Sequence, residues 1–421
     1  MTLTGGNART PAGALGASGI LAGGASAWGL DPSITFLNHG SCGACPRPVL
    51  AAQQAWRDAM EAEPIDFLGR QLPALMDGTR AALGAFVGAD ADDLVFVPNA
   101  TAGISTVLRS VRFGPGDELL ATSLEYNASL NALRYAAERD DARVVIADIA
   151  LPVLDADTVV AAILARVTPR TKLALISHIT SPTGIILPLA EIVRELDRRG
   201  VDTLVDGAHG PGMVAIHLDD IGAAYYTGNG HKWLSAPKGS AFLHVRRDRQ
   251  AGIRPLAIGH GANDPRTDRS RFRLEHDVMA TQDPTPYLGM GAAIAFMGSL
   301  LPGGWPALMA ANHALALEAR DALRDALDVE PLVADDMLGS IAAVPLRRPG
   351  SALPRGAGAA IHERLFHEHR IEVPIYEIPG GPVGLDGSAE SITFVRVSAQ
   401  RYNNIEQYRR LAPILAGLVR G

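Results

Sequence analysis

Lysine and cysteine are scarce in this sequence. Of its 38 basic residues only three are lysines, at positions 172, 232 and 238, so chemistry that needs a primary amine has three side-chain candidates. The only cysteines are Cys42 and Cys45. Two cysteines cannot form a disulfide framework for 421 residues, and no second CxxC or nearby histidine pair completes a metal site. We therefore expect two reduced structural thiols, no metal, and a cytoplasmic location.

Long apolar runs and basic runs are also missing. No stretch contains eighteen uninterrupted apolar residues, which argues against a transmembrane helix. The net charge is −7, which argues against nucleic acid or an anionic membrane as the main partner. Residues 1–28, rich in Gly, Ala, Ser and Thr, predict a flexible arm. The Ala25-Ser26-Ala27 step resembles a signal cleavage site, but the glycine-broken stretch before it disfavours a secretory signal.

Short apolar runs alternate with helical stretches between residues 90 and 245. Such alternation predicts a mostly parallel, doubly wound sheet of seven strands, and runs that are apolar on both faces suit a sheet covered on both sides. The expected strands are 94–97, 118–122, 143–148, 173–177, 202–206, 223–227 and 240–245, and the expected helices are 100–111, 127–139, 157–167 and 189–199.

The pattern changes after about residue 295. A long helix over 306–327 is followed by a helix at 361–369, a strand at 392–397 and a last helix at 405–419. We predict a large domain over 29–295 and a smaller α+β domain over 296–421.

Polar clusters follow five of the predicted strands. They are Asn99-Ala100-Thr101, Glu125-Tyr126-Asn127, His178 to Thr183, Asp206 to His209, and Thr227 to Lys232. Ligands of a doubly wound sheet bind at the carboxyl ends of its strands. We therefore expect these clusters to converge on one site.

Elimination selects one lysine as the reactive amine. Lys172 opens a strand, at the wrong end of the sheet, and Lys238 lies in the turn Ala-Pro-Lys-Gly. Lys232 follows a strand, where a buried lysine can lose its proton and attack an aldehyde. Read alone, it would be an ordinary surface charge.

Other strand-end residues suit pyridoxal 5'-phosphate (PLP). Asp206 can keep a pyridine nitrogen protonated, and His209 can hydrogen-bond the phenolic oxygen. The helix beginning at Ala100 and Thr101 offers free N–H groups to a phosphate, which Asn229 and His231 could also contact. The alternatives are an Asp206 helix cap, a satisfied loop histidine and a plain Asn99 cap.

Two further residues have a functional and a structural interpretation. Tyr126 can stack on a cofactor ring or be a buried structural tyrosine. Arg396 interrupts an apolar strand and can hold a substrate carboxylate in a bidentate fork, or be solvated on an edge strand.

The chain resembles class V PLP-dependent enzymes of fold type I, and among them isopenicillin N epimerase-like proteins. The resemblance covers nearly the whole chain after residue 28. It is carried by LNHGSCGACPRPV, AEPIDFL, PNATAG, SHITSPTGIILP, VDGAHGPG, TGNGHKWLSAPKGSAFLHV, ATQDPTP and VRVSAQRYN.

The resemblance implies the aspartate aminotransferase fold and a role for each matching residue. Lys232 would be the Schiff-base lysine, Asp206 would pair with the pyridine nitrogen and His209 would face the ring oxygen. Tyr126 would cover the ring, and Ser181 would lie near the ring oxygen. Ala100, Thr101, Asn229 and His231 would bind the phosphate, with Thr281 reaching the other subunit's phosphate in a homodimer with shared sites. Arg396 would hold the α-carboxylate of an amino-acid substrate, and Asn38 and His39 would line the substrate mouth.

The reaction is left open among several types. Epimerisation or racemisation is the first hypothesis, with Tyr126 and His39 as candidates for a second base beside Lys232. A lyase or oxidative deaminase acting on a cysteine S-conjugate is the second, and transamination the third; a non-enzymatic binding protein on the same scaffold is a further alternative. Desulfurases of this family use a cysteine in the C-terminal half, which is absent here, so persulfide formation is not expected. The segment 271–279 departs from the family pattern and is expected to face the substrate.

Overall fold

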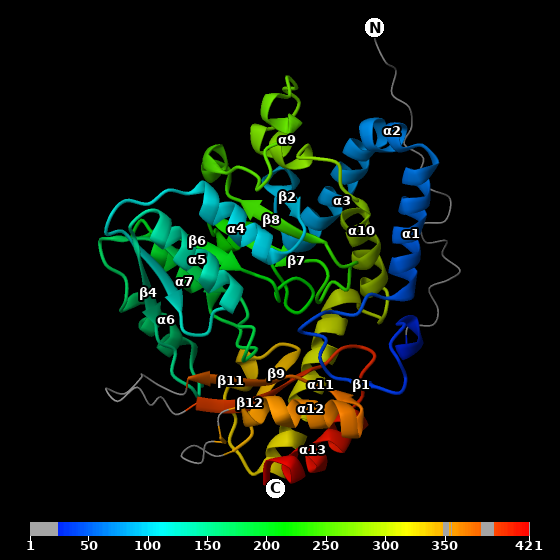
Figure 1. The fold of residues 1–421 in the computed structure, drawn as a ribbon, viewed down its shortest axis with the longest axis vertical. Helices are drawn as coiled ribbons and strands as arrows, with labels where there is room; N and C mark the ends of the chain where they lie inside the picture. The colour runs from blue at the N-terminus through cyan, green and yellow to red at the C-terminus, as the bar shows by residue number, and fades with distance from the viewer. Residues whose placement is uncertain (1–23, 348–352, 355, 380–390, 421) are drawn as a thin grey trace.

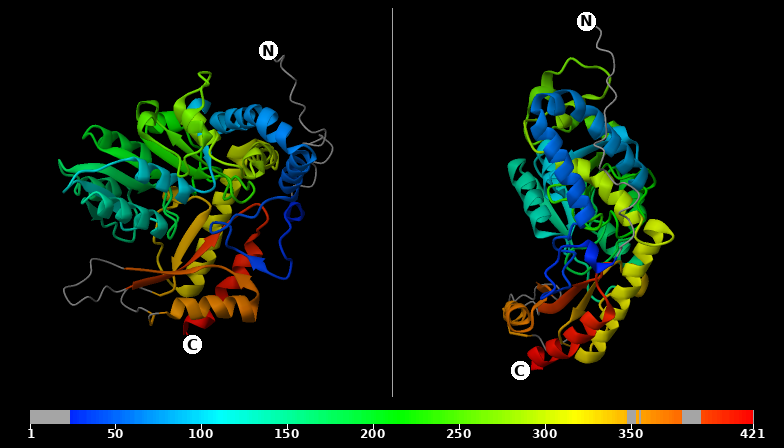
Figure 2. Two further views of the ribbon diagram at one scale, coloured as in Figure 1. Left: turned by 45° about the horizontal axis from the view of Figure 1, so that its top comes forward. Right: turned by 90° about the vertical axis from the view of Figure 1, so that its right-hand side faces the viewer.

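The computed structural model describes residues 24–347, 353–354, 356–379 and 391–420. A larger part built around one sheet lies above a smaller part, and α11 (Gly304–Leu327) runs between them (Figures 1 and 2). Most of the predicted flexible arm falls outside the described residues. Its last residues form a short 3-10 helix, Ala25–Ala27, followed by the buried Trp28.

The larger part contains the predicted seven-stranded sheet. Its spatial order is β2-β8-β7-β6-β5-β3-β4, and β8 alone runs antiparallel to its neighbours, so the mostly parallel α/β fold is confirmed. The strands are β2 (Leu94–Val97), β3 (Glu118–Thr122), β4 (Arg143–Ala147), β5 (Thr171–Ser177), β6 (Asp202–Asp206), β7 (Tyr225–Asn229) and β8 (Ala241–Val245).

Alternate side chains of each strand enter two separate cores, one on each face of the sheet. In β3, Leu119 and Ala121 pack with α4 (Ala100–Ser110) and α5 (Asn127–Arg139). Leu120 belongs to the other core, together with α6 (Ala156–Leu164) and α7 (Leu189–Asp197). Burial on both faces is why a strand such as β2 is apolar throughout.

The larger part also contains further helices outside the four named above. In chain order they are α1 (Arg47–Ala62), α2 (Pro64–Asp66), a π-helical turn (Phe67–Gln71), α3 (Leu72–Val87), α8 (Leu218–Ile221), α9 (Arg271–Asp277) and α10 (Thr285–Gly298). Helix α10 packs against both α1 and α3, and α9 lies at the top of Figure 1.

The smaller part combines helices with a three-stranded antiparallel sheet in the order β11-β12-β9. Its elements after α11 are β9 (Ile341–Pro345), α12 (Ala357–His369), β10 (Ile371–Glu372), β11 (Ile375–Pro379), β12 (Ser391–Ser398) and α13 (Ile405–Arg420). The predicted helices and strand of this region therefore form within a few residues of their expected positions. Strand β1 (Thr35–Phe36) pairs with β10, which brings the chain before α1 to the smaller part.

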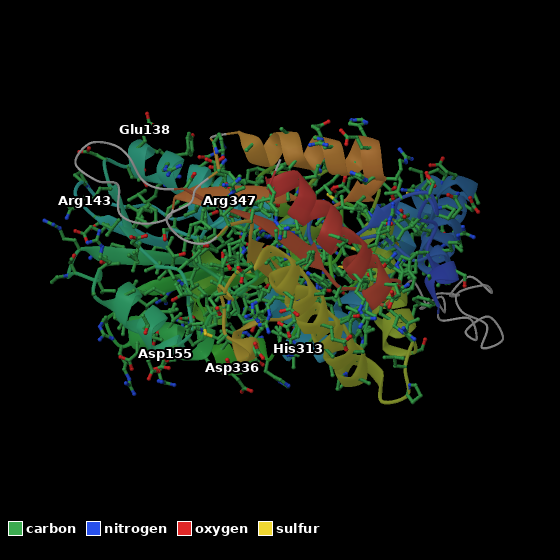
Figure 3. The ribbon with its side chains drawn as sticks, turned by 90° about the horizontal axis from the view of Figure 1, so that it is seen from below. Glu138, Arg143, Asp155, His313, Asp336 and Arg347 are labelled. Atoms are coloured by element: carbon green, nitrogen blue, oxygen red, sulfur yellow. The ribbon has the colours of Figure 1, made fainter. Side chains whose placement is uncertain are left out.

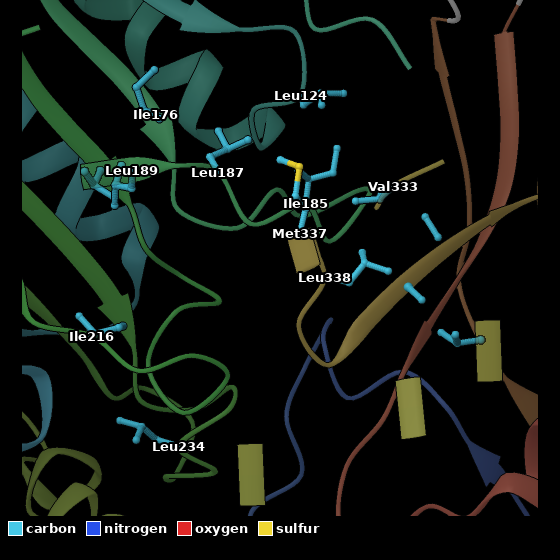
Figure 4. Packing of buried hydrophobic residues seen from close by; sticks show 14 of the residues in the cluster. Leu124, Ile176, Ile185, Leu187, Leu189, Ile216, Leu234, Val333, Met337 and Leu338 are labelled. Carbon is cyan, nitrogen blue, oxygen red and sulfur yellow. The ribbon is translucent and has the colours of Figure 1, made fainter. Parts of the chain in front are cut away.

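Apolar side chains join the two parts. Ile185, in the connection from β5 to α7, bridges to Leu338, and Val153 bridges to Val333. These residues belong to one buried cluster, and Figure 4 shows Ile185, Val333 and Leu338 close together at this junction. The smaller part is thereby held against the larger part at the end of the sheet where β4 and β5 end.

Candidate active site

Polar residues from five strand ends line one cavity of about 150 Å³, so the structure brings together the clusters that the sequence placed at corresponding strand ends. Ser41, from the segment before α1, joins them. The lining residues are Ser41, Asn99, Ala100, Thr101, Tyr126, Ser177, Ile179, Ser181, Asp206, Ala208, His209, Asn229, His231 and Lys232.

Lys232 follows β7 and directs its amine at a histidine. Its Nζ lies 3.0 Å from Nε2 of His209, and the indole Nε1 of Trp233 lies 3.3 Å from Nδ1 of the same ring. Burial lowers the pKa of Lys232 to about 8, although the nearby Asp206 charge opposes that shift. At pH 7 about a tenth of the amine is therefore uncharged and nucleophilic.

The other two lysines are not amines of this cavity. Lys172 is exposed near the start of β5, at the end of the sheet away from the strand-end cavity. Lys238 donates to the backbone carbonyl of Gly43 and does not line the cavity.

Asp206 ends β6 as a buried carboxylate rather than a helix cap. One oxygen accepts from the Ser129 hydroxyl at 2.7 Å, and the other from the backbone N–H of Ala208 at 3.1 Å. Gly207 has to be a glycine because a Cβ there would lie 2.1 Å from the Tyr226 ring. Because Gly207 has no side chain, the backbone just after the Asp206 carboxylate can pass close to this ring.

Glu125 is a second buried acid at this end of the sheet. Its carboxylate accepts from the Thr122 hydroxyl at 2.8 Å, and from both the backbone N–H and the hydroxyl of Ser177. Burial raises the pKa of Glu125 to about 7, and the charge of Asp206 adds to the rise. Ser177 pairs with Asp206 across β5 and β6, so the two acids belong to one network.

The start of α4 is capped by one side chain, and it carries a hydroxyl that can donate a hydrogen bond in the cavity. Asn99 caps the helix by accepting from the Ala102 N–H at 2.8 Å, as the plain-cap alternative expected. Asn229 accepts from the Ala100 N–H at 2.9 Å, which ties α4 to the end of β7, so the Ala100 N–H is not one of the free groups that the sequence predicted. Thr101 lines the cavity and adds a hydroxyl to the positive end of the helix, an arrangement suited to phosphate.

His231 completes this end of the cavity. Its Nδ1 donates to the Ser240 carbonyl at 3.0 Å, which leaves Nε2 as the other polar atom of the ring. Burial lowers the pKa of His231 to about 4.

Arg396 is buried in the central strand β12, so the edge-strand alternative is wrong. Its side chain is 1% exposed and donates to the Ser181 carbonyl and the Ser41 hydroxyl at 2.6 Å each, and to Asn38 Oδ1 at 3.3 Å. No carboxylate of the described residues pairs with it, and its Nε has no partner there. A buried guanidinium without a counter-ion is costly, which points to an anionic ligand.

Comparisons with known proteins decide the family. The family model described as "Aminotransferase class-V" matches residues 36–350. The chain belongs to the class V aminotransferase family.

Relatives and structures agree with that assignment. Isopenicillin N epimerase of Amycolatopsis lactamdurans is 35% identical over 92% of this chain and 96% of its own. A probable chloroplastic L-cysteine desulfhydrase of Arabidopsis thaliana is 30% identical over 93% and 84%. The solved structure of the cystine C-S lyase C-DES, in complex with cysteine persulfide, superposes with a TM-score of 0.76 at 23% identity, over 91% of this chain and 98% of that one.

The family is PLP-dependent, so the predicted cofactor is confirmed at the level of the family. The residues of this class V chain fit it. The cavity offers an amine with a lowered pKa, a buried carboxylate, and a helix N-terminus at separate points of its lining. Among the described residues no group of three or more His, Cys, Asp or Glu side chains could hold a metal, and no helix could cross a membrane.

Several predicted positions of this class V chain differ from expectation. His39 does not line the cavity: its ring is fully buried, with Nδ1 2.8 Å from the Tyr402 hydroxyl and Nε2 3.1 Å from the Lys232 carbonyl. Burial lowers the pKa of His39 to about 3. Helix α9, within the segment expected to face the substrate, contributes nothing to the lining.

The remaining predicted residues differ in their contacts and in their exposure. Asn38 is outside the lining but bonds Arg396 and donates to Glu372 at 2.8 Å. Tyr126 lines the cavity and is 48% exposed, so it is not a buried structural tyrosine. Thr281 is exposed and contributes nothing to this chain's cavity.

Sequence reasoning missed several residues of the site. Glu125 was named only as part of a strand-end cluster, and Ser129 and Ser177 were not selected, because Ser177 meets Glu125 and Ser129 meets Asp206 only in the folded chain. Cys42 was taken as structural, yet it is exposed beside Ser41, which lines the cavity. The sequence feature that could have pointed to Cys42 is its place in the segment that begins with Asn38, which was predicted to line the substrate mouth.

Proposed function

We propose that this protein is a PLP-dependent epimerase or racemase acting at the α-carbon of an amino acid or an amino-acid-derived intermediate. The observation that carries the proposal is the buried Arg396, which has no carboxylate partner among the described residues and shares Ser41 and Ser181 with the cavity that holds Lys232. A substrate α-carboxylate supplies the missing charge.

PLP, when bound, supplies an electron sink for the charge that develops at the α-carbon. Asp206 would keep the pyridine nitrogen protonated, and the Ser129 hydroxyl and Ala208 N–H hold that carboxylate in place. Arg396 would orient the substrate through its carboxylate. Lys232 would take the α-proton, because its lowered pKa allows the amine to accept and return protons near neutral pH.

Epimerisation needs a proton donor on each side of the α-carbon. Lys232 follows β7 and Tyr126 follows β3, and these strands lie on either side of β6, which carries Asp206. We assign the second proton to Tyr126, because the burial of His39 removes the other candidate. The 35% identity to isopenicillin N epimerases supports this reaction.

The test follows the α-proton of L-amino acids and small peptides in heavy water. We expect exchange accompanied by inversion, detected by NMR and chiral chromatography, and loss of both in Lys232→Ala. The Tyr126→Phe variant should exchange the proton while losing inversion. Exchange with complete retention by the unaltered enzyme would refute the epimerase proposal.

A C–S lyase is the second candidate function. The probable L-cysteine desulfhydrase at 30% identity favours it. Lys232, Asp206 and Arg396 would then keep the roles described for epimerisation. The substrate would lose its sulfur group as a thiol, and hydrolysis of the remainder would give pyruvate and ammonia. Release of these products from cysteine or its S-conjugates would establish this branch. Formation of a keto acid with conversion of the cofactor to its amine form would instead identify an aminotransferase.

We also propose a homodimer with shared active sites in the cytoplasm. Exposure of Thr281, which this chain's own cavity does not use, supports a role for it at a partner's phosphate. The absence of any cysteine after Cys45 argues against persulfide formation on a C-terminal loop.

A further inference from the structure

Trp233, His209 and Lys232 form a chain of hydrogen bonds whose direction can be deduced. An indole N–H can donate but cannot accept. Because the Trp233 Nε1 lies 3.3 Å from the His209 Nδ1, that nitrogen must present its lone pair.

The proton of His209 is therefore on the other nitrogen. Burial holds the pKa of His209 well below its usual range, so the ring is neutral and carries one proton. With Nδ1 accepting, that proton is on Nε2, 3.0 Å from the Lys232 amine. The amine must then accept, which only its uncharged form can do.

We propose that Trp233 is a positioning residue that fixes His209 in its Nε2–H tautomer, so that His209 donates to the Lys232 amine and favours the uncharged form that can react with an aldehyde. The inference rests on Lys232 being the residue that takes PLP, as proposed above. It excludes His209 as a base, because accepting a proton at Nδ1 would break its bond to the indole.

The surroundings hold the indole rigidly in this role. Trp233 is fully buried, and its ring lies against that of His39 with centroids 4.8 Å apart. The His39 Nε2 also bonds the Lys232 carbonyl, so the backbone carrying both Lys232 and Trp233 is anchored. Rotation of the indole away from His209 would disturb this packing.

Other titratable groups face this pair from every neighbouring element. Asp206 favours the charged amine, and Arg396 disfavours it. Among the described residues these groups are Asp206 at the end of β6, Arg396 on β12, Cys42 and His39 before α1, Tyr126 at the start of α5, and His231 after β7. All of them are unchanged when the indole alone is replaced.

The test compares Trp233→Phe with the unaltered protein after removal of the cofactor. The rate at which each captures added PLP is followed by absorbance as a function of pH. In capture, the Nζ lone pair leaves its hydrogen bond with His209 and forms the new C–N bond, and the aldehyde oxygen leaves as water with both amine hydrogens. The unaltered protein should reach half its maximal rate near pH 8, where the amine loses its proton.

The variant should need a higher pH. Without the indole, His209 can move its proton to Nδ1 and accept from the ammonium form of Lys232 at Nε2. That hydrogen bond favours the charged lysine, so the midpoint should rise by about one pH unit, and capture at pH 7 should slow about tenfold. Phenylalanine preserves the packing against His39.

Two controls separate the possible failures. Trp305→Phe removes an indole N–H that donates to the Ile294 carbonyl at 3.0 Å, away from the cavity, and should leave the midpoint unchanged. Lys232→Ala should capture no cofactor. Capture by Lys232→Ala would refute the assigned lysine, whereas an unchanged midpoint in Trp233→Phe, with Lys232→Ala inactive, would refute only the role of Trp233.

A measurement on the unaltered protein tests the tautomer directly. Nitrogen NMR of histidine-labelled, cofactor-free protein, assigned with His209→Gln, should show the His209 proton on Nε2. A proton on Nδ1 would overturn the inference even if Trp233→Phe failed to fold.

Discussion

The stability of a Glu125→Gln variant, relative to that of the unaltered protein, should increase as the pH rises. The carboxylate is 5% exposed and has donors from Thr122 and Ser177, so glutamine keeps its shape and its acceptor oxygen. The Ser177 hydroxyl can rotate to accept from the new amide. What the substitution removes is the ionisation of a buried acid.

The size of the effect follows from the raised pKa of Glu125. Burial and the Asp206 charge raise it from 4.5 in an unfolded chain to about 7 in the folded protein, so unfolding releases a proton between these values. Stability from this group is therefore complete below pH 4.5 and is lost as the pH rises to about 7. The loss amounts to about 3 kcal/mol, which glutamine does not suffer.

The assay uses cofactor-free protein at pH 5 and pH 8. The difference in free energy of unfolding between Glu125→Gln and the unaltered protein should move in favour of the variant by about 2 kcal/mol or more. Infrared titration should show a protonated carboxyl that ionises near pH 7 and is absent from the variant. Glu138→Gln, at an exposed position of α5 that is labelled in Figure 3, controls for loss of a charge. A difference that stays constant with pH, or no such carboxyl band, would refute the reasoning.

Three other substitutions test the site. Arg396→Gln should raise KM on the order of 100-fold without loss of folded protein, because it removes a buried charge that has no counter-ion among the described residues; an unchanged KM would exclude a carboxylate contact. Asp206→Asn should lower kcat on the order of 100-fold while cofactor is retained, as measured by steady-state kinetics and absorbance. Gly43→Ala places a Cβ 2.5 Å from the Lys232 carbonyl, so cofactor occupancy should fall and stability should drop by about 1–3 kcal/mol. Gly78→Ala has open space within 4 Å and is the matched control; equal behaviour of the two variants would contradict this steric argument.

Much of the larger part could be predicted because its strands are local signals. Runs such as 94–97 and 173–176 are apolar throughout, and buried parallel strands need no partner information to be recognised. The predicted strand at 223–227 shifts to β7 (Tyr225–Asn229), because pairing with β6 and β8 sets its limits. Strand β1, only two residues long, exists through its pairing with the distant β10 and left no local pattern.

The candidate site divides in a similar way. Lys232, Asp206, Asn229 and Thr101 could be selected because each lies at or just after the end of a strand, at a predictable end of the sheet. The errors concern residues whose environment depends on distant contacts. His39 is covered by Tyr402 and by the Lys232 backbone, and Glu125 acquires its partners from β5.

The sequence by itself determined the strand-helix alternation, the choice of one amine among three, and the polar groups at the strand ends, because these follow from local periodicity and side-chain chemistry. Only the tertiary structure decided which of those groups share a cavity, that Arg396 is buried without a counter-ion among the described residues, and which nitrogen of His209 carries the proton. Burial and hydrogen-bond direction arise between segments far apart in the chain, as with Ser41 and Arg396, and no local pattern encodes them.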